Sequence, residues 1–337
     1  MKFGEKFNEY RTKEPDWFTS KCSSHIEYKR LKKVLKRCRT CQPNLPSSSI
    51  EDETQGNQES VCDASGFCPC ESCTLCDQNF FPDLLNEVSG ITWCFNSRVR
   101  HLLHVHVARG MQRYVNVIRT CFKKPDQESM VEEGRMLLEY ITMNAIAIRK
   151  ILKKYDKVHS SEMGKYFRLK LMSNHLELLQ SPWIIELGAF ALNFAGEYGN
   201  EFSNYFAVDV ENEDPVMTLS IPNWTRLEYN LKCPICLELV FNPYALTCGH
   251  LFCKQCACSA GSALLFQGLK TAEANAKCPV CREEGVFAKA VHMLELDLLI
   301  RRRCSEYWKE RIIHERAEMV KQSKEYWELQ TQIVIGF

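Results

Sequence analysis

Eight soft metal ligands cluster in one short stretch of this 337-residue chain. They are Cys233, Cys236, Cys248, His250, Cys253, Cys256, Cys278 and Cys281. A Cys-x2-Cys turn can bring both of its thiolates to one metal, and a structural zinc ion takes four sulfur or imidazole donors in a closed tetrahedral shell. Eight donors therefore predict two structural Zn2+ ions. Such metals hold the shape of the segment and perform no chemistry themselves.

The alternative, that these are simply small buried residues, suits an isolated cysteine better than eight at such intervals. The chain has nineteen cysteines, and its first residues, "MKFGEKFNEY", lack the apolar core of a secretory signal. We therefore expect the protein in the cytoplasm, the nucleus or both, where clustered cysteines bind metal more readily than they form a disulfide framework.

Three cysteines, a histidine and four further cysteines, with one residue between Cys248 and His250, resemble a RING finger. The resemblance implies interleaved zinc sites. Cys233, Cys236, Cys253 and Cys256 would hold the first zinc, and Cys248, His250, Cys278 and Cys281 the second.

RING fingers bind a ubiquitin-conjugating enzyme charged with ubiquitin and promote attack on the thioester by a substrate lysine. The resemblance implies that Ile235 and Pro279 form an apolar shelf for that enzyme, completed by Leu265 or Phe266. Arg282 matches the family's linchpin position, where a guanidinium fork can bond the conjugating enzyme and ubiquitin together. No nucleophilic cysteine on this chain is required.

Lysines also repeat at helical spacing in two segments. Tyr28, Lys32 and Lys36 share one helix face, and Lys150, Lys153, Lys154 and Lys157 share another. Like charges at these spacings weaken a helix, which suggests a compensating anion. The alternative is a solvated lysine face.

The segments "MKFGEKF", "YKRLKKVLK" and "KILKKYDK" resemble an SPX domain over roughly residues 1–180. The resemblance implies a shallow pocket for an inositol polyphosphate or pyrophosphate, lined by Lys2 and the residues of the two lysine faces. An SPX domain followed by a RING finger is similar to a plant ubiquitin-ligase family of the nitrogen limitation adaptation and benzoic acid hypersensitivity type. That family implies phosphate transporters as substrates, phosphate and nitrate balance as the process, and peripheral association with the plasma membrane.

The surrounding sequence predicts a mainly α protein: an N-terminal SPX helical bundle, a small zinc-stabilised RING finger and a C-terminal helix. We expect helices over 2–13, 25–38, 80–122, 126–158 and 183–195, with a disordered insertion at about 42–66. The predicted domains are 1–180 (SPX), 181–229 (linker, loosely packed between residues 196 and 223), 230–285 (RING) and 286–337 (helical tail). In the tail, Leu294, Leu298, Trp308 and Ile312 form the expected apolar stripe.

Several other functions are excluded or remain as alternatives. No apolar run is long enough to span a membrane, and a net charge of +1 without aromatic residues between the lysines argues against nucleic-acid binding.

The rival function is a non-enzymatic SPX signalling adaptor with a protein-binding zinc module. A homodimer through the C-terminal helix is left open, because its apolar stripe is irregular. Whether Cys62–Cys76 bind a further zinc is also left open, and His101, His104 and His106 are interpreted as structural or solvated.

Overall fold

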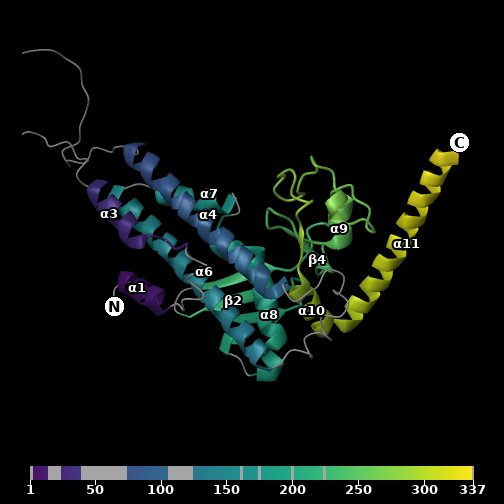
Figure 1. The fold of residues 1–337 in the computed structure, drawn as a ribbon, viewed down its shortest axis with the longest axis horizontal. Coiled ribbons are helices and arrows are strands. Elements are labelled where there is room, and N and C mark those ends of the chain that lie inside the picture. The colour runs from purple at the N-terminus through teal and green to yellow at the C-terminus, as the bar shows by residue number, and fades with distance from the viewer. Residues whose placement is uncertain are drawn as a thin grey trace, which may run out of the picture. The chain divides into compact units, whose positions relative to one another are not determined.

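A computed structural model gives the structure of the chain at residues 3–13, 24–38, 74–104, 124–159, 162–173, 176–198, 201–222 and 225–335. It is mainly helical, as predicted (Figure 1). The chain divides into two compact units, one made of residues 1–94 and 142–178 and the other of residues 95–141 and 179–337.

The first unit is built from helices at both lysine-rich segments. They are α1 (Phe3–Lys13), α3 (Tyr28–Cys38), the first part of α4 (Thr74–His104), the second part of α6 (Lys124–His159) and α7 (Met163–Ser173). The last turn of α6 contains Lys157 and His159, basic residues that suit the negative end of the helix dipole.

Aromatic and aliphatic side chains fill the core of this unit. The Phe80 ring stacks on Tyr155 at 4.7 Å between centroids, and Phe81 stacks on Phe167 at 4.7 Å. The fully buried Asn144 of α6 accepts a hydrogen bond from the backbone N–H of Ile26 at 3.0 Å. That bond joins the chain entering α3 to α6, so the two lysine-bearing helices are held in one packed unit.

The second unit contains a buried helix and a three-stranded antiparallel sheet. The elements are α8 (Pro182–Tyr198), a 3-10 turn (Glu201–Tyr205), β1 (Phe206–Asp209), β2 (Val216–Ile221) and β3 (Thr225–Asn230), in the order β1-β2-β3. Gly188 of α8 faces this sheet, where an added Cβ would lie 2.5 Å from the Phe206 ring. Glycine therefore permits the close approach of α8 to β1.

The cysteine-rich segment and the tail complete this unit. They comprise β4 (Pro243–Ala245), β5 (Leu251–Cys253), α9 (Lys254–Ala260), a 3-10 turn (Leu269–Thr271), β6 (Val291–His292), α10 (Leu294–Arg303) and α11 (Ser305–Ile335). The small sheet has the order β5-β4-β6, so β4 is its central strand.

A buried carboxylate fixes α8 to the start of α10. Glu186 accepts hydrogen bonds from the backbone N–H groups of Glu295 at 2.8 Å and Leu296 at 3.1 Å. Those N–H groups lie in the first turn of α10 and have no partner within the helix, so Glu186 supplies the missing acceptor and places negative charge at the positive helix end. Asn193 of α8 adds a bond to the Glu295 carbonyl at 2.9 Å.

Two expectations differ from the structure. The segment between residues 196 and 223 is not loosely packed, because Phe202, Phe206, Met217 and Leu219 are buried against α8 or within the sheet. The tail is not one continuous helix either: Cys304 has non-helical dihedral angles and separates α10 from α11. Leu294 and Leu298 are buried, so they belong to the core.

Candidate functional site

The structure brings the eight predicted ligands together in two groups. Within each group, the candidate donor atoms all lie within 4.8 Å of one another. The first group is Cys233, Cys236, Cys253 and Cys256, and the second is Cys248, His250, Cys278 and Cys281. These are the two interleaved sets that the RING resemblance implied.

The distances within the groups fit zinc. A Zn–S bond of about 2.3 Å implies about 3.8 Å between two sulfurs of a tetrahedral site, and a Zn–N bond of about 2.0–2.1 Å implies about 3.6 Å between sulfur and nitrogen. The Cys236 and Cys253 sulfurs are 3.7 Å apart. Nδ1 of His250 lies 3.4 Å from the Cys248 sulfur and 3.7 Å from the Cys278 sulfur. Nδ1 is therefore the ring nitrogen placed to bind the metal.

The electrostatics of the first group also favour a cation. Hydrogen bonds from the Cys253 and Cys256 thiols lower the pKa of Cys233 far below its usual range. The same bond to Cys233 raises the pKa of Cys253. One thiolate thus suppresses ionisation of its neighbour, whereas a divalent cation would stabilise all four sulfurs as thiolates.

Two turns of the same geometry carry the outermost ligands. The sequence "CPICLE" begins at Cys233, and "CPVCRE" begins at Cys278. In each turn the backbone N–H four residues on donates to the first cysteine's carbonyl at 2.9 Å: Leu237 to Cys233 and Arg282 to Cys278. Leu237 and Arg282 both adopt positive φ, at 60° and 62°. This likeness between the turns is an internal repeat that the sequence analysis missed, although the paired hexapeptides would have revealed it.

The other ligands stand around β5. Gly249, between Cys248 and His250, has a φ of 88°, which non-glycine residues rarely adopt, and this turn aims both flanking side chains at one metal. Cys253 ends β5, and Cys256 follows in the first turn of α9. The backbone N–H of Phe241 donates to the Cys253 sulfur at 3.2 Å, a bond that orients this ligand from outside the metal shell.

The predicted conjugating-enzyme contacts are on the surface. Ile235 is 41% exposed, and Pro279 and Arg282 are exposed as well. Leu265 is 1% exposed, so it cannot contribute to an apolar shelf, and Phe266 is half-buried with its ring against Tyr326 of α11. Two exposed apolar side chains that we did not predict are next in sequence to ligand or predicted contact residues: Leu237 and Val280, at 66% and 47%.

The tail helix α11 packs along this zinc module. Trp308 lies against Phe241 at 5.9 Å between ring centroids, Arg311 pairs with Glu238 at 3.0 Å, and the Gln322 side chain accepts a bond from the Leu265 backbone N–H at 2.9 Å. These residues lie on one face of the helix. That face of α11 therefore forms part of the module and is not available for a partner.

Two residues of the predicted basic face, Tyr28 and Lys150, contact the same ring within the first unit. Tyr28 packs edge-on against Phe3 of α1 at 5.3 Å, and the Lys150 ammonium lies 4.8 Å from the Phe3 ring centroid. Lys32, Lys150, Lys153 and Lys157 are exposed, and Lys154 is half-buried. Burial raises the pKa of Tyr28, whose hydroxyl is protonated at neutral pH in either case and can donate a hydrogen bond. The contacts bring residues of α1, α3 and α6 to one place.

Some predicted features lie outside the described residues. These are Lys2, the Lys36 side chain, the side chains of the Cys62–Cys76 group, His106, the His104 side chain and the insertion at 42–66. Of the histidines interpreted as structural or solvated, His101 is exposed on α4.

Two interleaved four-ligand groups on paired turns define a RING finger, and a RING-type zinc-finger family model matches residues 233–279. The chain is 54% identical to a probable E3 ubiquitin-protein ligase BAH1-like from Arabidopsis thaliana and 54% identical to a BAH1-like 1 protein from Oryza sativa subsp. indica. It is 38% identical to the E3 ubiquitin-protein ligase NLA of Arabidopsis thaliana. Each match covers 100% of both chains.

The chain therefore belongs to the plant BAH1-like and NLA family of RING-type E3 ubiquitin-protein ligases. The predicted enzymatic function, that of a RING-type E3 ligase, is confirmed, and the alternative of a non-enzymatic adaptor is not. No solved structure matches the chain. In the part of the chain that the structure describes, no helix is long and apolar enough to cross a membrane. The homodimer stays a prediction.

Proposed function

We propose that the lysine face of α3 and α6 binds an inositol polyphosphate or pyrophosphate, and that this ligand regulates ubiquitin transfer to phosphate transporters in phosphate and nitrate balance. The observation that supports the proposal is that exposed lysines lie on α3 and α6, two helices that both meet α1 at Phe3, through Tyr28 and Lys150. Inositol phosphates carry dense negative charge, which ammonium groups can approach from several directions.

Pairing on α3 distinguishes this face from an ordinary charged surface. Arg30 turns toward α4, where it pairs with Asp83 at 2.8 Å and also with Glu87. Lys32, Lys153 and Lys157 have no carboxylate partner among the described residues. Positive charge directed into the bundle is thus neutralised, whereas charge on the lysine face is left for an external anion.

Calorimetric titration of the full chain with inositol hexakisphosphate tests this proposal. Replacing both Lys32 and Lys153 with alanine should weaken binding at least about tenfold, because two charge-assisted contacts are lost. Lys170 is an exposed residue of α7 in the same unit and is not part of the lysine face. Lys170→Ala should therefore leave the affinity unchanged. Equal affinity of the parent and the double variant would reject the lysine face as the binding site.

We further propose that Ile235 and Pro279 contact the ubiquitin-conjugating enzyme and that Arg282 holds ubiquitin's thioester in a reactive conformation. Each residue lies on a turn whose geometry a zinc ligand pair fixes, so these side chains are positioned before any partner arrives. The ligase's contribution is thus to orient the thioester, while the reacting cysteine belongs to the conjugating enzyme.

Single-turnover discharge of a ubiquitin-loaded conjugating enzyme onto free lysine measures this step directly. Ile235→Ala should slow discharge by weakening recruitment, and Leu169→Ala, a comparably exposed apolar change on α7, should not. Arg282→Lys keeps the charge but loses the planar fork, so it should lower the rate at a saturating concentration of the loaded enzyme. Full activity of Ile235→Ala and Arg282→Lys would contradict these roles.

The substrate class requires a cellular measurement. Ubiquitinated peptides from phosphate transporters should decrease in plants that lack this protein and return when the parent chain is restored. A chain with Cys278→Ala, which removes a ligand of the second zinc group, should not restore them. Unchanged transporter ubiquitination in its absence would direct the search to other substrates.

A further inference from the structure

The outer face of α11 carries apolar side chains at a strict seven-residue interval. Ile313, Val320, Trp327 and Val334 are 67%, 65%, 61% and 83% exposed. We call these four residues the outer stripe. They stand about opposite the helix face that packs on the RING module through Trp308, Glu315 and Gln322.

A second set of small or amphipathic residues completes a heptad pattern. Ala317, Lys324 and Thr331 each lie four residues after one stripe residue and three before the next, which gives the alternating spacing of a coiled-coil seam. The seam runs over about 33 Å of helix. Such a seam needs a facing helix, because seven-residue spacing keeps its side chains directed at one partner along the whole length.

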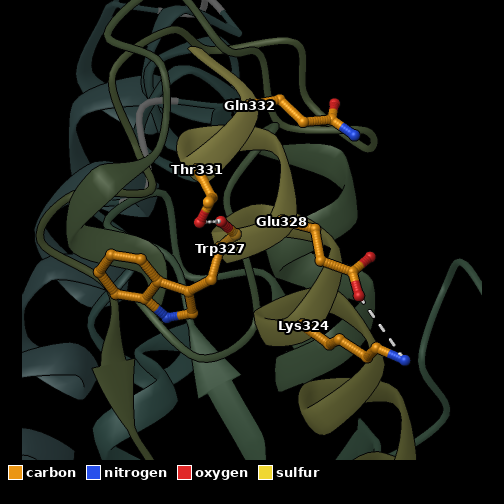
Figure 2. Close-up of a pocket in the computed structure, with 5 residues that line it drawn as sticks. All are labelled: Lys324, Trp327, Glu328, Thr331 and Gln332. Carbon is orange, nitrogen blue, oxygen red and sulfur yellow. Dashed lines mark hydrogen bonds and ion pairs between the residues drawn. The ribbon is translucent and has the colours of Figure 1, made fainter. Parts of the chain in front are cut away.

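The surface contains a hollow of the kind that a facing side chain fills. Lys324, Trp327, Glu328, Thr331 and Gln332 line it (Figure 2). The first four are spaced i, i+3, i+4 and i+7, the arrangement that accepts a knob in coiled-coil packing. Three of the polar side chains that line it are partnered within the helix: the Thr331 hydroxyl donates to the Trp327 carbonyl at 2.7 Å, and Lys324 pairs with Glu328 at 3.6 Å.

We propose that the outer stripe is an interface with a second copy of this chain, in which two α11 helices pair antiparallel. The register that places Ala317 of one copy opposite Trp327 of the other also places Val320 opposite Lys324 and Ile313 opposite Thr331. The smallest seam residue thereby enters the hollow beside the largest one. The aliphatic stem of Lys324 covers Val320 while its ammonium reaches solvent.

Charge favours this orientation over the parallel one. The exposed flank of the seam is basic in its first half, at His314, Arg316 and Lys321, and carries Glu328 in its second half. Antiparallel pairing brings His314 beside Glu328 of the partner and opposes one pair of like charges, the two Lys321 side chains, at the centre. Parallel pairing would instead bring Arg316 toward Lys321 of the partner on both sides of the seam, which is two like-charge contacts, and would oppose two Trp327 rings.

Sedimentation of the full chain tests the interface. A chain concentration of about 100 μM is used, because even a weak helical dimer is populated there. The parent should sediment as a dimer, and Trp327→Glu as a monomer. Leu329→Glu is the matched control, since Leu329 is 55% exposed on the same helix but lies off the seam, and this variant should stay dimeric. A monomeric parent, or a dimer that survives Trp327→Glu, overturns the proposal.

A photoreactive benzoylphenylalanine in place of Trp327 tests the orientation, with isotopically distinct copies mixed so that links between chains are identified. The antiparallel register predicts a link to the tryptic peptide of residues 317–321 in the other copy. A link between chains within residues 325–337 would indicate parallel pairing and overturn the register. Both measurements are independent of inositol phosphate binding and of ubiquitin transfer, so they stand or fail separately from the proposed function.

Discussion

Asp297 of α10 makes the free energy of unfolding depend on pH between about 4 and 6. Its Oδ1 accepts a hydrogen bond from the Trp308 indole N–H at 3.1 Å, which joins α10 to α11. Burial of the carboxylate, with a smaller contribution from the neighbouring Glu315 carboxylate, raises the pKa of Asp297 to about 6 despite the opposing effect of the Trp308 hydrogen bond. The residue as a whole is half-buried, so the enclosed part is its carboxylate.

The direction of the pH effect follows from this shift. The native state binds the Asp297 proton more tightly than the unfolded chain, whose aspartates titrate near pH 4. Ionisation therefore opposes folding, and stability from this group decreases as the pH rises from about 4 through 6. A difference of about two pKa units corresponds to a penalty of about 3 kcal/mol at pH 7 and about half of that at pH 5.

Asp297→Asn removes the charge but keeps an oxygen acceptor for Trp308. We expect the variant to exceed the parent in free energy of unfolding by about 3 kcal/mol at pH 7 and by about 1.5 kcal/mol at pH 5, as measured by urea unfolding with zinc present. Asp214→Asn is the matched control. The Asp214 side chain is 87% exposed, so this variant removes a surface charge from the same unit.

If Asp297→Asn is no more stable than the parent at pH 7, the carboxylate is not penalised by burial. If its advantage does not change between pH 7 and pH 5, ionisation of Asp297 is not the cause.

Three further predictions concern packing and metal. Glu186→Ala should lower the free energy of unfolding by about 2–3 kcal/mol in urea, because two buried N–H groups at the start of α10 lose their acceptor; an unchanged value would contradict the cap. Gly188→Ala should destabilise by about 1–3 kcal/mol in a thermal melt, since the new Cβ would overlap the Phe206 ring, and a melt at or above the parent's would contradict that close approach. Elemental analysis should find two zinc ions per chain and fewer in Cys278→Ala. Chelation should expose Trp308 and shift the tryptophan emission of the chain to the red, by more in the parent than in Trp308→Phe; the same shift in both would show that zinc does not hold Trp308 against the module.

The helices depend mainly on local sequence, whereas the breaks and the sheet packing depend on distant residues. The helices at 3–13, 28–38, 124–159 and 182–198 were predicted because apolar spacing and terminal charges act within one segment. The break at Cys304 was not, because the charged pattern runs through it without a proline or glycine. The sheet after α8 was interpreted as a loosely packed linker, because its packing depends on Gly188 meeting Phe206, a contact between residues 18 positions apart.

The eight ligands of the site could be named from the residue types and their spacing, since four-donor zinc chemistry and short turns leave few ways to use eight such residues. Which apolar side chains stay exposed depends on packing: Leu265 is buried beneath α11, whereas Leu237 and Val280 are exposed. It also assigned Trp308 to the inner face of α11 and Trp327 to the outer one. Spacing along a helix defines its faces. Which face is covered depends on the packing of segments that are distant in the chain, and a local pattern does not predict that packing.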